Sequence, residues 1–172
     1  MSRTIYLIRH AKSSWENPGQ TDWERDLNDR GRRDGPRMAE YCLRNFPAPA
    51  RILSSDSQRT RSTARFLIEA GWVGQEHVSY SNELYLASGD RILNSLESLD
   101  DEVESVAVLA HNPGIHNAMV QLSRDGSHTD FPTFAIARLE SAENGNWSEL
   151  MSCPWRLDQF IYPKKLNVPG IS

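Results

Sequence analysis

Short apolar runs alternate along most of the chain with longer segments whose apolar residues recur every third or fourth position. This pattern is typical of a fold that alternates strands and helices. The runs at 4–8 and 106–110 are apolar at nearly every position, as expected of strands that helices cover on both faces. The segments predicted as strands are 4–9, 51–55, 78–81, 105–110 and 131–139, with an edge strand near 147–152.

Helices are predicted in the intervals between these strands. Asn28 is suited to cap a helix over 29–46, because its side chain can accept a hydrogen bond from a backbone amide of the first turn. Gly35-Pro36 lies in the middle of this segment, so we expect a kink or a restart there. The other predicted helices are 57–70, 89–100 and 114–123.

This alternation of elements predicts an α/β fold. Helices should cover both faces of a mainly parallel central sheet, which gives a three-layer α/β/α sandwich. The last strand segment should add antiparallel edges. A length of 172 residues is typical of one domain. We expect that domain to span 1–163, with a loose C-terminal tail over 164–172.

Composition narrows the classes of partner and the compartment. The net charge of −4 argues against binding to nucleic acid, which needs a basic surface. No apolar stretch approaches the roughly 20 residues that span a membrane, and the chain opens into a strand with no signal peptide. Cys42 and Cys153 have neither a metal-like spacing nor a disulfide pattern, and Cys42 is expected in the core. We therefore expect a cytoplasmic protein.

Charged and imidazole side chains follow three of the predicted strands. Arg9 and His10 end the first strand, Arg59 follows the second after a polar turn, and His111 directly follows the fourth. A single histidine at a strand end is usually structural, but the carboxyl ends of parallel strands meet where open α/β folds bind ligands. A guanidinium pairs with a phosphoryl group through a planar fork of donors. Two arginines would also keep a nearby imidazole neutral, as a nucleophile requires.

Three separated motifs occur in a fixed order along the chain. They are Arg9-His10-Ala11, Ser55–Thr60 with Thr63-Ala64, and His111 after an apolar strand. With these motifs the chain resembles the histidine phosphatase superfamily, whose fold is phosphoglycerate mutase-like. The strings at 7–15, 27–31 and 111–114 are similar to its small SixA-type phosphohistidine phosphatase branch. The resemblance extends over 4–139.

The resemblance implies a role for each matching residue. His10 would be the nucleophile that takes the phosphoryl group. Arg9, Arg59 and His111 would complete the phosphate pocket and stabilise charge on the transferring oxygens. Ser13 matches a position near the bound phosphate in the family.

The motifs specify the proton donor less well than the nucleophile. Glu83 falls where mutase-like members keep a carboxylate that acts as proton donor and then as base; the alternative is a solvated carboxylate at a strand end. Asn112 follows the second histidine, where the acid-phosphatase branch has Asp, so Glu83 is the only acid that a motif supports. Asn112 and the free amides of the following helix start are expected to bind phosphate. Glu16 stands where mutases often have Asn, which puts contacts to a sugar phosphate in doubt.

Neither a metal nor a cofactor is expected. His77, His116 and His128 have no ligand-like spacing, whereas a zinc site needs three or four converging ligands. No Walker-type phosphate-binding loop is present in the sequence. Trp15, just after the first motif, is expected either in packing or at the mouth of the pocket.

The leading hypothesis is a metal-independent phosphatase that forms a covalent phosphohistidine. Its expected substrate is phosphohistidine on a protein, and its product is inorganic phosphate. The short connection between Arg59 and His111 favours this substrate, because it leaves the pocket open to a phosphate on a protein surface. Three alternatives remain open: a small-molecule phosphomonoester phosphatase of the same superfamily, a phosphoglycerate mutase, and a non-catalytic phosphate-binding module.

Overall fold

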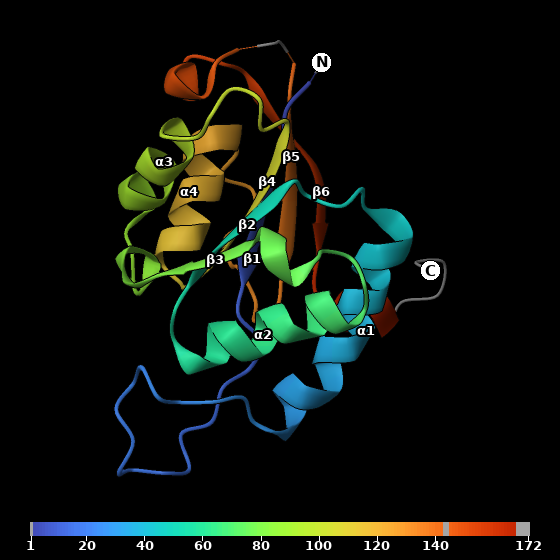
Figure 1. Cartoon of the computed structure of the whole chain (residues 1–172), viewed down its shortest axis with the longest axis vertical. Helices are drawn as coiled ribbons and strands as arrows, with labels where there is room; N and C mark the ends of the chain where they lie inside the picture. The colour runs from blue at the N-terminus through green and yellow to red at the C-terminus, as the bar shows by residue number, and fades with distance from the viewer. Residues whose placement is uncertain (1, 143–144, 168–172) are drawn as a thin grey trace.

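The computed structural model describes residues 2–142 and 145–167, which form a six-stranded sheet flanked by helices (Figure 1). The strands are β1 (Thr4–Arg9), β2 (Arg51–Ser55), β3 (Val78–Ser81), β4 (Ser105–Ala110), β5 (Ile136–Ser141) and β6 (Trp155–Ile161). Their order across the sheet is β3-β2-β4-β1-β5-β6. The first four strands pair in parallel, whereas β5 and β6 extend the sheet in antiparallel pairing. The predicted sheet, mainly parallel with late antiparallel strands, is confirmed.

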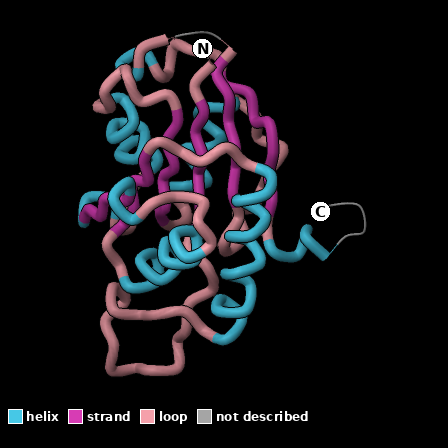
Figure 2. The backbone as a smooth tube through the Cα atoms, turned by 45° about the vertical axis from the view of Figure 1, so that its right-hand side comes forward, coloured by secondary structure: helices cyan, strands magenta, loops and turns pink. Residues whose placement is uncertain are grey.

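Helices cover both faces of this sheet (Figures 1 and 2). One face carries α1 (Asp29–Asn45) and α2 (Gln58–Glu69), and the other carries α3 (Gly89–Glu97) and α4 (Gly114–Ser123). The predicted three-layer α/β/α sandwich is therefore confirmed. The helix α3 ends earlier than predicted, and the other three helices lie within one residue of their predicted bounds.

Strand β1 shows why the inner positions of a central strand are apolar. Ile5 and Leu7 pack against the layer of α3 and α4, whereas Tyr6 and Ile8 pack against α1 and α2. Successive side chains of a strand point to opposite faces, so both sets are buried. An unpaired polar group here would lose its hydration on either face. Polar chemistry is consequently confined to the end of the strand, from Arg9 onward.

Helix α1 begins where the sequence predicted. The Asn28 side chain caps it by accepting a hydrogen bond from the Gly31 amide at 2.9 Å. The helix then continues through Gly35-Pro36, so the predicted restart is wrong. Gly35 packs so closely against the ring of Phe66 in α2 that a Cβ would not fit. The glycine thus allows α1 and α2 to lie in close contact at this point.

The predicted strand at 131–139 is wrong in its first half. The segment before Ile136 is a loop, and β5 begins only there. Pro132 cannot donate to a ladder, and Phe134 has a positive φ of 55°, which no strand tolerates. The Phe134 amide instead donates to the carbonyl oxygen of His10 at 3.0 Å. The loop is thereby fixed against the segment that follows β1.

The edge strand predicted near 147–152 is also wrong. A 3₁₀ helix, η3 (Trp147–Glu149), occupies its start, and the true edge strand is β6. Trp147 and Leu150 are both buried, and three positions apart they share one side of a helical turn. The indole of Trp147 donates to the carbonyl oxygen of Val103 at 2.8 Å. Burial of these two side chains therefore decides the local structure.

The end of the chain differs from the predicted loose tail over 164–172. Its first residues belong to the 3₁₀ helix η4 (Pro163–Asn167), whereas 168–172 lie outside the described residues. The domain span of 1–163 stays a prediction. Two further 3₁₀ helices are η1 (Gln75–His77) and η2 (Asn82–Leu84). Within the described part of the chain, no helix has the length and apolarity to cross a membrane.

The carboxyl ends of β1, β2 and β4 meet at one edge of the sheet, because these strands are parallel neighbours. Arg9 is in register with Ala110, so the chain emerges at His10 and His111 from adjacent positions. The long loop 10–28 then extends beyond this edge in both views (Figures 1 and 2). The edge is where the predicted chemistry converges.

Candidate active site

A cavity of about 230 Å³ opens where these strands end. Of the seven residues that the sequence singled out for chemistry, six line it. They are Arg9, His10, Ser13, Arg59, His111 and Asn112. The rings of the two histidines have centroids 5.2 Å apart. The cavity thus combines two imidazoles and two guanidiniums, which the sheet delivers from separate strands.

His10 presents one ring nitrogen in a defined tautomer. Its Nδ1 lies 2.7 Å from the carbonyl oxygen of Ala11, and Nδ1 carries the proton because a carbonyl oxygen only accepts. Nε2 therefore keeps its lone pair, which attack on phosphorus requires. Burial lowers the pKa of His10 well below its ordinary 6.5, and the charges of Arg59 and Arg9 lower it further. The ring is neutral at pH 7, the form that a nucleophile needs.

His111 is held between Arg59 and Ser55. Its Nδ1 accepts a hydrogen bond from Arg59 Nη2 at 3.3 Å, so Nε2 carries the proton and donates to Ser55 Oγ at 2.8 Å. Burial, and then the charge of Arg59, lowers the pKa of His111 to about 3. His111 is therefore a second neutral ring, fixed in orientation beside His10.

The low pKa of His111 predicts a loss of stability in mild acid. The unfolded chain, with an imidazole pKa near 6.5, binds a proton that the folded protein excludes. The free energy of unfolding therefore falls as the pH drops below 6.5, down to the folded-state pKa. Between pH 7 and pH 5 this group contributes a loss of about 2 kcal/mol. In urea unfolding at both pH values, wild type should lose that much more than His111→Asn; equal losses would contradict the low pKa.

Arg9 keeps most of its donors free of the protein. Among the described atoms only its Nη1 meets an acceptor, the carbonyl oxygen of Phe131 at 2.9 Å, although a guanidinium has five N–H groups. The amide nitrogen of Asn112 donates to the same carbonyl at 3.0 Å, which sets this side chain beside Arg9. Burial lowers the pKa of Arg9, but a guanidinium stays charged at neutral pH. Nε is buried and has no hydrogen-bond partner among the described atoms, so the donors that remain for an anion in the cavity are the other N–H groups of the two terminal nitrogens.

Arg59 is held by Asp22, a residue in the long loop after β1. Its Nη1 donates to the Asp22 carbonyl oxygen at 2.5 Å, and its Nη2 pairs with Oδ2 at 2.9 Å. The hydroxyl of Tyr85 donates to the same Oδ2 at 2.6 Å. Burial raises the pKa of the Asp22 carboxyl, but hydrogen bonds from Tyr85, Arg59 and Arg25 outweigh it and hold the pKa below its ordinary range. Asp22 is thus a permanent anion that orients the fork of Arg59.

Arg25 ties the same loop together and lines the cavity. Its guanidinium donates to Ser13 Oγ at 2.6 Å, to the Ser14 carbonyl oxygen at 2.8 Å and to Asp22 Oδ1 at 2.6 Å. The hydroxyl of Ser13 is fixed at the cavity wall by this contact. Arg25 also adds a third guanidinium to the cavity.

Close backbone packing positions the segments around the cavity. A Cβ at Gly31, in the first turn of α1, would collide with the carbonyl oxygen of Lys12. A Cβ at Gly114, at the start of α4, would collide with the carbonyl oxygen of Ala87. Only glycine permits these two approaches. They press the loops after β1 and η2 against the helix starts that border the site.

Asp22, Arg25 and Tyr85 contribute to the site although the sequence did not predict them. All three lie on loops, where no periodic pattern reports on burial. The one available signal is the position of Arg25 just before the string at 27–31, which carries the family resemblance. Lys12, inside the first motif, lines the cavity as well.

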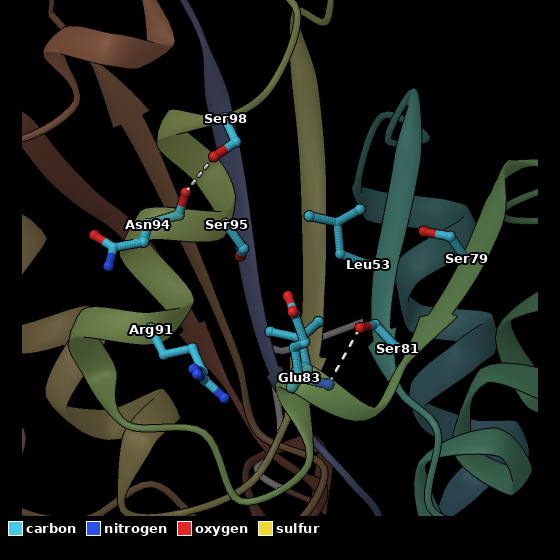
Figure 3. Close-up of a pocket in the computed structure, with 9 residues that line it drawn as sticks. Leu53, Ser79, Ser81, Glu83, Arg91, Asn94, Ser95 and Ser98 are labelled. Atoms are coloured by element: carbon cyan, nitrogen blue, oxygen red, sulfur yellow. Dashed lines mark hydrogen bonds between the residues drawn. The ribbon is translucent and has the colours of Figure 1, made fainter.

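Glu83 is the one predicted site residue that lies elsewhere. It lines a separate cavity of about 330 Å³ between β3 and α3, together with Ser81 and Arg91 (Figure 3). Ser81 Oγ accepts a hydrogen bond from the Glu83 amide at 3.2 Å, and the Glu83 side chain is exposed. The role of Glu83 as proton donor in the His10 cavity stays a prediction, and the position of its side chain does not support that role.

Glu83→Gln should leave phosphate release nearly unchanged on both phosphohistidine and phosphate esters. A general acid contributes about 10²–10⁴-fold, and a carboxylate in a separate cavity cannot supply this effect. Steady-state rates on both classes of substrate measure it. A loss of about 10²-fold or more on esters would instead show that Glu83 reaches the reacting group.

Comparison with known proteins assigns the chain to a family. The sequence model of the histidine phosphatase superfamily (branch 1) matches residues 5–84. An uncharacterized protein of Mycobacterium leprae is 31% identical over 154 residues, which covers 83% of this chain and 91% of the relative. The crystal structure of a protein assigned as the phosphohistidine phosphatase SixA of Agrobacterium tumefaciens is 28% identical with a TM-score of 0.80, and covers 94% of this chain and 98% of that one. This chain belongs to the histidine phosphatase superfamily.

The match to the family model and the similarity to the Agrobacterium tumefaciens structure also show that this chain has a SixA-type architecture and is a phosphatase. The resemblance inferred from the motifs is therefore confirmed, as is the phosphoglycerate mutase-like fold. A mycobacterial glucosyl-3-phosphoglycerate phosphatase shares this fold with a TM-score of 0.67 at 17% identity, and covers 92% of this chain and 98% of that one. At that identity the likeness concerns the fold alone.

The described part of this histidine phosphatase offers no cluster of metal ligands. Residues 2–142 and 145–167 contain no group of three or more His, Cys, Asp or Glu side chains placed to hold a metal ion. His116 instead lies 2.7 Å from the carbonyl oxygen of His128 through its Nε2. Independence of the reaction from metal stays a prediction.

Proposed function

We propose that this histidine phosphatase removes the phosphoryl group from phosphohistidine on a protein through a covalent intermediate at His10. The observation that carries the proposal is the contact of His10 Nδ1 with the carbonyl oxygen of Ala11 at 2.7 Å in the wall of the cavity, which leaves Nε2 with its lone pair. Arg9 and Arg59 line the same cavity, where their guanidiniums can bind the oxygens of a phosphoryl group. Nucleophile and cations are thus assembled before substrate arrives.

The reaction proceeds in two transfers. Nε2 of His10 attacks phosphorus, and the bond between phosphorus and the donor nitrogen breaks. The donor ring, protonated on its other nitrogen, takes the electron pair and leaves as a neutral imidazole. Water then attacks the phosphoryl group on Nε2, which takes back its electron pair as inorganic phosphate departs. Arg9 and Arg59 neutralise the charge on the transferring oxygens in both steps. His111 donates no net proton and is restored unchanged.

The composition of the cavity wall supports phosphohistidine over a phosphate ester. None of the described residues that line the cavity is Asp or Glu, so no carboxylic acid there protonates a leaving alkoxide. Imidazole, with a pKa near 6.5, leaves far more readily than an alkoxide. Transfer from one imidazole to another also changes the type of bond very little.

The size of the cavity supports a protein substrate. Its volume of about 230 Å³ is below the roughly 300–1,000 Å³ of pockets that enclose small-molecule ligands. The cavity can therefore take a phosphoryl group and part of its leaving group, while the rest of the substrate stays outside. A phosphohistidine on a protein surface fits this requirement.

The test is phosphate release from a phosphohistidine-bearing domain and from a panel of phosphate esters, with chelator and without added metal. Wild type should release phosphate from the domain faster than from any ester. His10-dependent release from esters alone would move the substrate to small molecules, the alternative that keeps the mechanism. Binding of phosphate with release from neither would favour a non-catalytic module.

The proposed setting of this reaction is the cytoplasm, as expected from the sequence. Cys42 and Cys153 are both free thiols, and Cys42 is buried. Free thiols are in keeping with a reducing compartment. The proposed partner is accordingly a phosphorylated protein of that compartment.

A further inference from the structure

Large apolar side chains gather at the mouth of the catalytic cavity. Trp15 and Leu86 have the highest exposed fractions among the large apolar side chains described, 74% and 55%. Both line the same cavity as His10. Single exposed apolar residues are ordinary, but the two most exposed ones at the rim of one cavity point to a ligand.

Trp15 is held in a fixed orientation. The Cζ atom of Arg25 lies 3.2 Å from the centre of the Trp15 ring, in a cation–π stack on one face of the indole. Arg25 is itself buried and immobilised by hydrogen bonds to Ser13, Ser14 and Asp22. The indole is therefore a rigid platform whose exposed surface is free to contact a second group.

Leu86 is held at the rim at a cost in backbone strain. Its φ is +50°, in the left-handed region that a branched side chain rarely adopts. The hydroxyl of Tyr85 anchors the preceding residue to Asp22 at 2.6 Å, and Gly114 packs closely on Ala87 just after it. Strain of this kind persists where the surrounding structure imposes it, and it clusters at functional sites.

We propose that Trp15 and Leu86 form a clamp for the leaving group of the substrate. Cations at the base of the cavity bind the phosphoryl group, and the two apolar side chains at the rim contact a flat ring attached to it. The imidazole of phosphohistidine has this shape and stacks on an indole. The clamp rests on the proposed function and deepens it, because it explains how a ring is preferred over other leaving groups.

The test compares two donors with the same phosphorus–nitrogen bond. The leaving group of phosphohistidine is an imidazole ring. The leaving group of phosphoramidate is ammonia, which has no ring. Trp15→Ala and Leu86→Ala should each lower the ratio of kcat/KM for phosphohistidine over phosphoramidate by about 2- to 10-fold, the range for one aromatic or apolar contact. Trp15→Phe should restore most of the ratio. Leu43→Ala, at an exposed apolar position on α1 outside the cavity, should leave it unchanged.

Equal losses on both donors would overturn the clamp, since they would assign Trp15 to holding Arg25 and its loop. An unchanged ratio in both variants would overturn it too. If wild type cleaves esters but not phosphohistidine, the proposed function fails while the clamp is still tested with phenyl phosphate against methyl phosphate. A loss in Trp15→Ala confined to the phenyl ester would uphold the clamp, and equal losses would reject it.

Discussion

His10→Ala is expected to abolish phosphate release from every substrate. Two described imidazoles line the cavity, and the variant lacks the one with a free ring nitrogen, since both nitrogens of His111 are engaged by Arg59 and Ser55. Removing the nucleophile of a covalent mechanism lowers turnover by a factor on the order of 10⁶ in a well-studied hydrolase. Steady-state phosphate release, with detection to about 10⁻⁴ of wild type, measures the effect.

Two controls make this result specific. His77→Ala removes a surface imidazole outside the cavity and should retain wild-type turnover. His10→Ala should still bind inorganic phosphate, because Arg9 and Arg59 keep their positions in the cavity. Turnover above a few per cent of wild type in a His10→Ala protein that binds phosphate would assign the nucleophile to another group.

Arg59→Ala is expected to lower kcat/KM by at least about 10²–10³-fold, the loss typical of one transition-state donor. The side chain lies at 3% exposure in the cavity, and its fork is set by Asp22. Arg59→Lys should recover little, since an ammonium on a flexible stem cannot reproduce two directed contacts. Arg59→Ala should also raise the pKa of His111, because the charge of Arg59 helps to lower that pKa. Kinetics and NMR titration of the His111 ring measure the two effects.

The matched control for this prediction is Arg61→Ala, on the same helix. Arg61 is exposed, donates to the Asp56 carbonyl oxygen at 2.9 Å and stacks over Tyr80, outside the cavity. Its loss should leave kcat/KM close to wild type. Comparable losses in both variants would mean that net charge, and not the placement of Arg59, supports the reaction.

Three of the four central residues of the site could be predicted because they sit at strand ends, and the fourth, Arg59, lies in the first turn of α2. Parallel strands bring their carboxyl ends to one edge, so Arg9, His10 and His111 converge without any knowledge of side-chain contacts. Asp22 and Arg25 could not be predicted in this way. Their positions depend on hydrogen bonds that close a loop upon itself, and a loop has no period from which burial can be inferred.

The resemblance implied a role in the site for Glu83, whose side chain lies in a separate cavity. The short 3₁₀ helix after β3 places this side chain in the cavity beside α3 (Figure 3), which is separate from the cavity that His10 lines. The misplaced strand near 147–152 has a different cause, since the burial of Trp147 outweighs the local preference for extended backbone. No periodic pattern in the sequence reports either placement.

The covalent step at His10 is tested most directly by rapid-quench trapping with a phosphohistidine donor that carries a radiolabelled phosphoryl group. The predicted result is an acid-labile, alkali-stable label on His10, which forms and decays at rates that account for turnover. Phosphate release at full rate with no label on His10, or with the label on another residue, would contradict the mechanism.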